Sequence, residues 1–401
     1  AGIVRLVEQA QASRAPMARL ADRYALVFLG ITLLLAGGAW WWSGEATRAL
    51  AVLVVATPCP LILAVPVAVI AGMSRAASLG VLVKTAGALE ALAAVTTVVV
   101  DKTGTVTSAR PEVSEVRPQP GFTSDQVLAL AASLDQASGH VAAEALVRAA
   151  TARGLGLTLP QGVIEEAGRG LSGLVGGVKV VLGGSGYVRS QLLAGEDFAR
   201  GGIEGGTAVV AVGIDGRAAG LILLSDPLRA DAGAAISAFR AGGISRIVMA
   251  SGDRSDVAEK ASASLSLDAV AGDLTPEGKV DLIRRERAGG VVMMVGDGVN
   301  DAPALALADV GVAIGARGSA ASSEAADVVL LADDLSRLPL ACGIARRSRN
   351  IARQSAIAGL LLSFGAMVFA AFGYLSPVQG ALLQEVIDVA VILNALRALR
   401  G

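Results

Sequence analysis

Long uncharged runs near both ends of the chain limit its possible folds more than any other feature. Tyr24 to Trp42 carries no charge for 19 residues and Ala49 to Met73 carries none for 25, each long enough to cross a bilayer as a helix. The run from Gln354 to Gln384 is too long for one crossing and is interrupted at Gly373 to Pro377, so we expect two spans there. With 17% charged residues and a mean hydropathy of +0.61, the chain is too apolar for an ordinary soluble enzyme.

The positions of the arginines predict how the chain is oriented. Arg23 precedes the first span, Arg75 follows the second, Arg353 precedes the third and Arg397 follows the last. By the positive-inside rule these four ends face the cytoplasm. We therefore expect an integral membrane protein, in the plasma (inner) membrane, with the lipid bilayer as a partner. The net charge of −1 and the lack of a basic block with interleaved aromatic residues argue against nucleic acid as a partner.

The segment between the second and third spans has alternating strand-like and helical character, which predicts a cytoplasmic α/β region. Within it, the β-branched run Thr96 to Val100 ends abruptly on Asp101, followed by Lys102 and Gly104. In an open α/β sheet the reactive groups lie just beyond the carboxyl ends of the strands. A carboxylate flanked by a lysine can attack a phosphoryl group, because the cation offsets the repulsion between two anions. We therefore predict that Asp101 is a nucleophile.

Two further strand-like runs also end on aspartates. Ile247 to Ala250 leads into the sequence SGD, and Val291 to Val295 leads into GDGVND. Carboxylates at neighbouring strand ends repel one another unless a cation lies between them, and hard oxygen ligands suit Mg²⁺. Asp297 is the expected ligand beside Asp101, and Lys279 is placed to offset phosphate charge.

The strings DKTGTVT and GDGVNDAPAL resemble the phosphorylation motif and the hinge motif of P-type ATPases. The resemblance implies a haloacid-dehalogenase-like α/β phosphorylation domain that uses ATP and Mg²⁺. It implies that Asp101 is phosphorylated, that Asp297 and the Thr103 carbonyl hold Mg²⁺ beside it, and that Lys279 and Ser251 contact the phosphate. Ser251 replaces a commoner threonine and keeps the hydroxyl group. The expected catalytic residues are Asp101, Lys102, Thr103, Ser251, Gly252, Asp253, Lys279, Asn300 and Asp301.

The only histidine of the chain, His140, follows the sequence LDQASG and precedes a valine. This setting is similar to the Ser-x-His-Pro element of metal-transporting P-type ATPases, whose imidazole helps to place the adenine of ATP. The glycines of GRG, Gly168 and Gly170, look like the glycine pair of that subfamily, and they complete an expected nucleotide site with Asp135. Four positions depart from the family pattern and weaken the expectation of tight nucleotide binding: Asp135, Gly139, Val141 and Gly184.

Two prolines, Pro58 and Pro60, bracket Cys59 inside the second span. Proline removes amide donors and breaks the helix, which is tolerated in lipid where the freed carbonyls line a cavity or meet a ligand. A thiolate at such a break is a soft ligand for a transition metal. The last span adds Gln384, Glu385 and Asp388, and the two carboxylates are three residues apart and share a helix face. Charges inside a span are costly and usually functional, so both are candidate ligands of a transported ion.

A Cys-Pro element about forty residues before DKTGTVT resembles the heavy-metal branch of P-type ATPases. The resemblance implies ATP-driven export of a transition-metal cation through an aspartyl phosphate, with a soluble metal donor as a further partner. The best-known form of this branch has two cysteines around one proline, whereas Thr57 stands in the first position here. One thiolate with carboxylate and amide oxygens favours zinc, cobalt or nickel over copper(I), and copper(I) export stays the alternative.

The predicted organisation is one domain interrupted by another, between pairs of membrane helices. Residues 1–23 form a linker helix from an actuator domain, and 24–94 hold two membrane helices with a cytoplasmic extension. The phosphorylation domain comprises 95–107 and 225–340, an α+β nucleotide-binding domain comprises 108–224, and two membrane helices occupy 341–401. No Thr-Gly-Glu loop of an actuator domain occurs in the sequence, so we expect this fragment to be phosphorylated but dephosphorylated poorly.

Three other functions stay open at this point. A phosphatase of the same fold explains Asp101 and Asp297 but not four spans. A potassium-type pump subunit explains the ATP chemistry but not a proline-bracketed cysteine in a span. A metal-binding membrane receptor, the third, needs no phosphorylation of Asp101.

Overall fold

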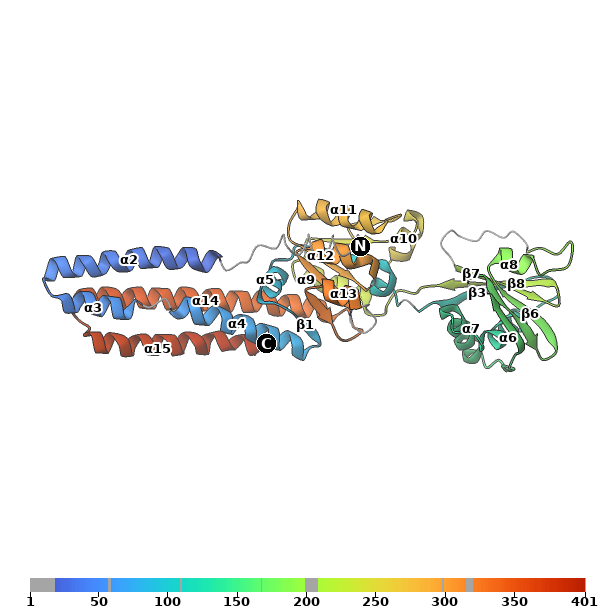
Figure 1. Ribbon diagram of the computed structural model, residues 1–401, viewed down its shortest axis with the longest axis horizontal. Coiled ribbons are helices and arrows are strands. Elements are labelled where there is room, and N and C mark those ends of the chain that lie inside the picture. The colour runs from blue at the N-terminus through green and yellow to red at the C-terminus, as the bar shows by residue number, and fades with distance from the viewer. Residues whose placement is uncertain are drawn as a thin grey trace.

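The computed structural model describes residues 19–56, 59–108, 110–166, 168–198, 208–297, 299–314 and 320–400. Three parts follow one another along the long axis of the molecule (Figure 1): a bundle of long helices, a central α/β domain and a domain built on an antiparallel sheet. Strands β1, β2 and β9 to β13 belong to the central sheet and β3 to β8 to the other. The antiparallel domain is therefore inserted into the central one, and the predicted fold class is confirmed.

The central sheet has seven strands in the order β1-β13-β12-β11-β2-β9-β10. All its pairings are parallel except that of β1 with β13. The catalytic strand β2 lies between β11 and β9, so both of its edges are paired. The strands are β1 (Val81–Val83), β2 (Thr97–Asp101), β9 (Arg246–Ala250), β10 (Ala269–Ala271), β11 (Val292–Gly296), β12 (Val310–Ile314) and β13 (Val328–Leu330).

Helices cover both faces of this sheet, which explains why β2 is buried along its whole length. Val98 and Val100 face the core formed with α5 (Ala86–Ala94), α9 (Ala232–Ala241) and the start of α14 (Arg337–Ala371). Val99 faces the opposite core, with α11 (Pro276–Arg287) and α12 (Ala302–Leu307). The alternation of side chains along a strand thus anchors β2 from two sides. The short helices α10 (Ser255–Ser262) and α13 (Ala320–Ala325) complete the described helices of this domain.

The inserted domain is a six-stranded antiparallel sheet in the order β3-β8-β7-β6-β5-β4. Helices α6 (Ser124–Asp135) and α7 (Val141–Ala152) pack on one face, where Leu128, Leu134 and Leu146 are fully buried. Helix α8 (Ser185–Arg189) packs on the other face. The strands are β3 (Glu112–Pro118), β4 (Gln161–Glu166), β5 (Gly170–Val175), β6 (Val178–Gly183), β7 (Ala208–Ile214) and β8 (Arg217–Ser225).

Two linkers join the inserted domain to the central one, and they run side by side. The Ser108 amide donates to the Pro227 carbonyl at 3.1 Å, and the Arg229 amide donates to the Val106 carbonyl at 3.0 Å. The linker that leaves the turn after β2 is therefore hydrogen-bonded to the linker that returns.

The bundle consists of α2 (Arg19–Ser43), α3 (Ala46–Val55), α4 (Cys59–Ser78), α14, α15 (Pro377–Ala395) and the terminal turn η3 (Leu396–Leu399). The second predicted span is divided into α3 and α4, as the two prolines predict. Helices α4 and α14 pack closely at Gly72, which has no side chain. A methyl group there would overlap the Ser348 hydroxyl.

Helix α14 is continuous from the central domain into the bundle. The boundary that we predicted at residue 340 falls inside this 35-residue helix. Pro339 does not interrupt the helix, since it lies in the first turn, where no amide partner is lost. At its base, the Arg346 guanidinium donates to the carbonyl of Val95, just before the catalytic strand, at 3.1 Å.

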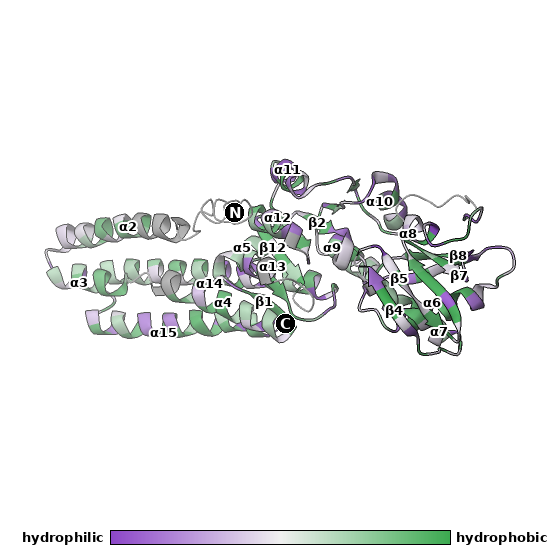
Figure 2. Ribbon diagram, turned by 45° about the vertical axis from the view of Figure 1, so that its right-hand side comes forward, coloured by the Kyte–Doolittle hydropathy of each residue, from purple (hydrophilic) through white to green (hydrophobic). Residues whose placement is uncertain are grey.

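The bundle exposes apolar side chains all along its length, and Figure 2 shows hydrophobic residues along each of its helices. Exposed examples are Leu34 and Trp41 on α2, Leu361 on α14 and Leu382 on α15. Among the described residues, α14 is the one helix that meets a strict length and composition criterion for crossing a membrane. Shorter apolar helices cover Val27–Ser43, Ala46–Val55 and Leu63–Ser78. The predicted topology of four crossings stays a proposal.

Candidate active site

The carboxyl ends of three neighbouring strands bring the predicted catalytic residues to one edge of the central sheet. Asp101 is the last residue of β2 and pairs in register with Ala250 of β9, directly before Ser251. On the other side, Val100 pairs with Val295 of β11, two residues before Asp297. Parallel strands end at the same edge, so the three motifs converge there as predicted.

The Asp101 carboxylate is paired with Lys279 inside this edge. The Lys279 ammonium lies 2.5 Å from Asp101 Oδ1 and 2.6 Å from Asp301 Oδ1. All three residues are buried, with exposed fractions of 5%, 8% and 2% for Asp101, Lys279 and Asp301. Lys279 reaches them from the first turn of α11, which Thr275 caps by accepting a hydrogen bond from Gly278.

Burial, together with the neighbouring charges of Asp301 and Asp297, raises the pKa of Asp101 to about 7, although Lys279 acts to lower it. One lysine therefore does not compensate three clustered carboxylates. Asp101, Asp297 and Asp301 each offer an oxygen within 4.8 Å of the others. This set of hard ligands fits a divalent cation such as Mg²⁺, which would neutralise the surplus charge.

The catalytic turn η1 (Lys102–Val106) approaches Asp297 so closely that only glycine fits at Gly104. A methyl group there would overlap the Asp297 carboxylate, and the φ angle of +71° is one that other residues rarely adopt. The glycine thus lets the loop close around the predicted cation site. The Thr103 side chain is exposed, and the role of its carbonyl as a ligand stays a prediction.

Lys102 does not contact the nucleophile, which corrects our expectation from the sequence. Its ammonium pairs instead with the Asp253 carboxylate, while the Asp253 amide donates to the buried Ser251 hydroxyl at 3.0 Å. Because Lys102 directly follows Asp101 in the chain, its side chain points away from the Asp101 carboxylate. The cation beside this carboxylate is Lys279, which comes from α11, much later in the sequence. Gly252 lies within this turn, and Asn300 is exposed in η2 (Val299–Asp301), next to the buried Asp301.

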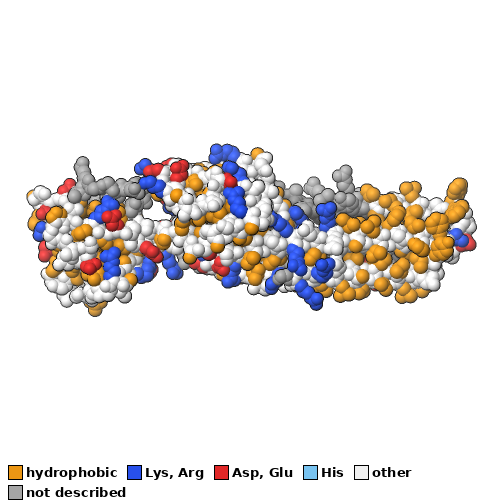
Figure 3. All heavy atoms as spheres, turned by 180° about the vertical axis from the view of Figure 1, so that it is seen from behind, with side chains coloured by type: hydrophobic (Ala, Val, Ile, Leu, Met, Phe, Trp, Pro, Cys, Tyr) orange, Lys and Arg blue, Asp and Glu red, His pale blue; other side chains and the backbone are white. Residues whose placement is uncertain are grey.

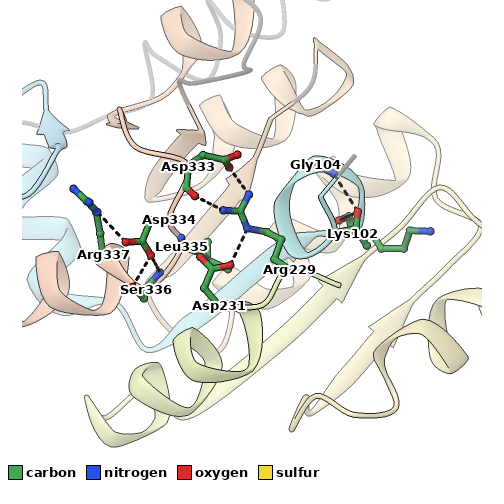
Figure 4. A network of polar contacts seen from close by, with 10 residues as sticks. Lys102, Gly104, Arg229, Asp231, Asp333, Asp334, Leu335, Ser336 and Arg337 are labelled. Atoms are coloured by element: carbon green, nitrogen blue, oxygen red, sulfur yellow. Dashed lines mark hydrogen bonds and ion pairs between the residues drawn. The ribbon is translucent and has the colours of Figure 1, made fainter. Parts of the chain in front are cut away.

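A polar network that the sequence analysis missed lies where the returning linker meets the base of α14 (Figure 4). The Arg229 guanidinium lies between Asp231 and Asp333, donating to Asp231 Oδ1 at 3.0 Å and to the Asp333 carbonyl at 2.6 Å. Asp231 also accepts from the Leu335 amide at 2.6 Å. The signal in the sequence was a charged cluster, DPLRAD, directly after the apolar strand β8.

The start of the same linker contacts the catalytic turn. The Thr107 hydroxyl lies 2.5 Å from Asp226 Oδ2, and the Gly104 amide donates to this hydroxyl at 3.3 Å. The linkers, the catalytic turn and α14 are therefore joined by side-chain hydrogen bonds.

The inserted domain contains a cavity of about 290 Å³ lined by all four predicted nucleotide-site residues, Asp135, His140, Gly168 and Gly170. His140 caps α7, because its Nδ1 accepts from the Ala142 amide at 3.2 Å. An imidazole that accepts at Nδ1 keeps Nε2 for another partner. The role of these four cavity residues in binding ATP stays a proposal.

The glycines of this cavity are required by the backbone. Gly168 has a φ angle of +74°. A methyl group on Gly170 would overlap the Leu182 carbonyl and the Tyr187 ring. A methyl group on Gly184 meets nothing within 4 Å, so this departure from the family pattern leaves open space beside the cavity.

Asp135→Asn should stabilise the protein at pH 7.5. Burial, and then the charge of Glu165, raise the pKa of Asp135 to about 6 from an ordinary 3.8. A raised folded-state pKa gives stability that is present below pH 4 and lost as the pH rises through 6, so the ionised carboxylate is a burden at neutral pH. We expect the variant to gain roughly 1–3 kcal/mol at pH 7.5 and nothing near pH 4, measured by urea unfolding.

Glu144→Gln, an exposed change on α7, is the control and should alter the unfolding free energy little at either pH. An Asp135→Asn gain of the same size at both pH values would contradict the assignment.

Buried polar side chains of the bundle connect α14 to α15, and Gln384 is the one that lies beside Asp388. The buried Gln384 side chain accepts from the Ser363 hydroxyl at 3.2 Å and donates to Asp388 at 3.0 Å. Glu385 is exposed, so the inward-facing group beside Asp388 is Gln384, which lies one helical turn before it, and not Glu385.

Gln384 lies at the level of the break between α3 and α4. One turn before it, a methyl group on Gly380 would lie 2.6 Å from Val55, the last residue of α3. One turn after it, Ile387 packs in a cluster with Ala64 of α4. Helix α4 begins at Cys59; the Cys59 side chain and Thr57 lie outside the described part of the structure.

Comparisons with known proteins cover both the α/β domains and the helical bundle. Residues 95–309 match the haloacid dehalogenase-like hydrolase family. A copper-exporting P-type ATPase of Mycobacterium tuberculosis is 40% identical over 99% of this chain and 53% of its own length. A silver-exporting P-type ATPase of Salmonella typhimurium is 39% identical over 98% of this chain and 50% of its own length. The chain spans about half the length of the curated relatives it matches.

Two kinds of solved structure are similar. A zinc-transporting PIB-type ATPase superposes with a TM-score of 0.84 at 30% identity, covering 99% of this chain and 67% of that one. The catalytic domain of a CPx-ATPase, CopB-B, superposes with a TM-score of 0.53 at 28% identity, covering 67% of this chain and 98% of that one. The first similarity therefore includes the bundle, and the second is limited to about two thirds of the chain.

Proposed function

Since the chain belongs to the heavy-metal branch of the P-type ATPases, we propose that it takes part in ATP-driven export of a transition-metal cation through an aspartyl phosphate. The observation that carries the proposal is the buried Asp101 carboxylate, held by Lys279 at the end of a strand whose domain continues through α14 into a bundle with a buried polar group. A phosphatase of this fold would have no use for that bundle.

The geometry supports nucleophilic attack by Asp101 on the γ-phosphorus of ATP. The bond from a carboxylate oxygen to phosphorus forms while the bond to the bridging oxygen breaks, and ADP leaves. The Lys279 ammonium, which lies beside the Asp101 carboxylate, would stabilise the negative charge on the oxygens of the transferred phosphoryl group. Asp101, Asp297 and the Thr103 carbonyl would hold a bound Mg²⁺, which would supply further charge neutralisation. Ser251 and Gly252 are placed to contact the phosphoryl oxygens, and the cavity of the inserted domain takes the adenine.

For the ion, we propose a divalent cation of the zinc, cobalt and nickel class. Its ligands would be Cys59, Asp388 and the Gln384 oxygen, a mixed soft and hard set that suits such ions better than copper(I). Copper(I) export is the second candidate, because relatives named for copper and silver align over nearly the whole chain. The bilayer, in the plasma (inner) membrane, and a soluble metal donor belong to the same proposal.

Asp388→Ala should reduce ion-stimulated phosphorylation of the protein from ATP by tenfold or more, about the cost of a lost ligand or its partner. Cys59→Ala should have the same effect, and Glu385→Ala, three residues away on an exposed position, should have little. The measurement is labelling from radioactive ATP in membranes against zinc, cobalt, nickel, copper(I) and silver(I).

Stimulation by copper(I) and silver(I) alone would reject the divalent class and keep the pump. Labelling that no metal changes would reject metal transport itself.

A further inference from the structure

Four exposed arginines lie around the bundle at one level, where it meets the central domain. At this level η3 packs against α4 and α14, and Ala71 of α4, Ala352 of α14 and Ala398 of η3 lie at the same end of one packed cluster. Arg353 directly follows Ala352, Arg397 directly precedes Ala398, and Arg347 and Arg400 lie within two turns of the same cluster. We call Arg347, Arg353, Arg397 and Arg400 the arginine collar; Figure 3 shows the basic side chains gathered at this junction.

Little negative charge balances the collar. Helix α14 contains no acidic residue, and neither do α4 and η3. Within the described part of the chain, Arg397 donates to Asn394, and no carboxylate forms an ion pair with any of the four. Arg349 is left out of the collar, because its charge already acts on the half-buried Glu90.

The collar borders directly on exposed apolar surface. On α14 the first large exposed apolar side chain after Arg353 is Ile357, one turn or about 6 Å along the helix. Near the end of α15, Leu393 and Leu396 are exposed just before Arg397. A ligand of this border must therefore offer a negative group on one side and hydrocarbon on the other.

We propose that the arginine collar is a binding surface for anionic phospholipid headgroups. One guanidinium group can donate two parallel hydrogen bonds to the oxygens of a phosphate. Basic residues at a cytoplasmic membrane surface also attract anionic lipid. One lipid bridging Arg353 and Arg397 would hold η3 against the middle of α14. The inference rests on the membrane location proposed above, but not on the transport of metal or on phosphorylation.

The test compares lipid retention by the protein in vesicles of phosphatidylcholine with and without phosphatidylglycerol. After detergent extraction, co-purified lipids are counted by native mass spectrometry. We expect phosphatidylglycerol to be retained at least tenfold over phosphatidylcholine. The variant with all four collar arginines changed to glutamine should lose this preference, since each arginine contributes about fivefold.

The matched control changes four exposed arginines of the cytoplasmic domains, Arg148, Arg153, Arg189 and Arg284, to glutamine. It has the same change in charge and should keep the lipid preference. A collar variant with lysines should keep part of it, which separates lost charge from misfolding. Added inorganic phosphate should not displace the lipid, because the hydrocarbon also binds.

Three results would overturn the proposal: an unchanged lipid preference in the glutamine variant of the collar, an equal loss in the control, or displacement by inorganic phosphate. Metal-stimulated labelling of Asp101 is scored in the same samples. A preparation that is labelled normally but shows no lipid preference rejects the collar alone, and one that retains lipid but is not labelled rejects the pump alone.

Discussion

Asp101→Asn should abolish labelling of the protein from the γ-phosphate of ATP, reducing it by at least about a thousandfold. The amide has nearly the same shape as the carboxylate, but its oxygen is a poor nucleophile for phosphorus. The substitution also removes one of three crowded charges, so the protein should stay folded and become no less stable. Acid-stable labelling after a brief incubation with radioactive ATP measures the effect.

Asp256→Asn is the matched control, because this exposed carboxylate of α10 pairs only locally with Arg254. Its labelling should equal that of the unchanged protein. Label that persists on the Asp101→Asn variant would place the phosphate elsewhere and leave the receptor interpretation open.

Gly104→Ala should reduce phosphorylation by about a hundredfold, although it adds a single methyl group. That group would overlap the Asp297 carboxylate, and the positive φ angle resists the change as well. Either the turn or Asp297 must move by about 1 Å, and such a displacement of a reacting group costs roughly this factor. The Mg²⁺ concentration for half-maximal labelling should rise together with the loss, because Asp297 is a proposed ligand.

Gly87→Ala tests the same chemical change at a glycine with room around it. The added methyl group would meet only the Thr85 hydroxyl, at 4.0 Å, in the first turn of α5. We expect normal labelling and a small gain in stability, as alanine favours helix. Equal losses in both variants would show that Gly104 has no special place at the site.

The predictable part of the site came from local patterns. A β-branched run that ends on an aspartate determines both the strand and the end at which its carboxylate lies, so Asp101, Ser251 and Asp297 could be brought together without coordinates. The cysteine between two prolines likewise predicted the break between α3 and α4. In both cases the informative residues are neighbours in sequence.

The part that could not be predicted depends on packing between distant segments. Lys102 is adjacent to Asp101 in sequence, yet the ion pair of Asp101 is formed with Lys279, which is 178 residues away. Whether Gln384 or Glu385 faces inward depends on how α15 is rotated against α14, which spacing alone does not determine. Arg229 was missed for the same reason, since its partner Asp333 is 104 residues away.

Because α14 is uninterrupted, a tilt of the helix at its base in the central domain displaces its far end in the bundle by a larger distance. At 1.5 Å per residue its 35 residues measure about 52 Å, and Ser363, beside Gln384, lies about 39 Å from the base. A tilt of only about 5° at the base would move the far end of the helix by about 4–5 Å. Small rearrangements around Asp101, if phosphate is transferred to it as proposed, would reach the far end of this helix enlarged, because no break in α14 absorbs them.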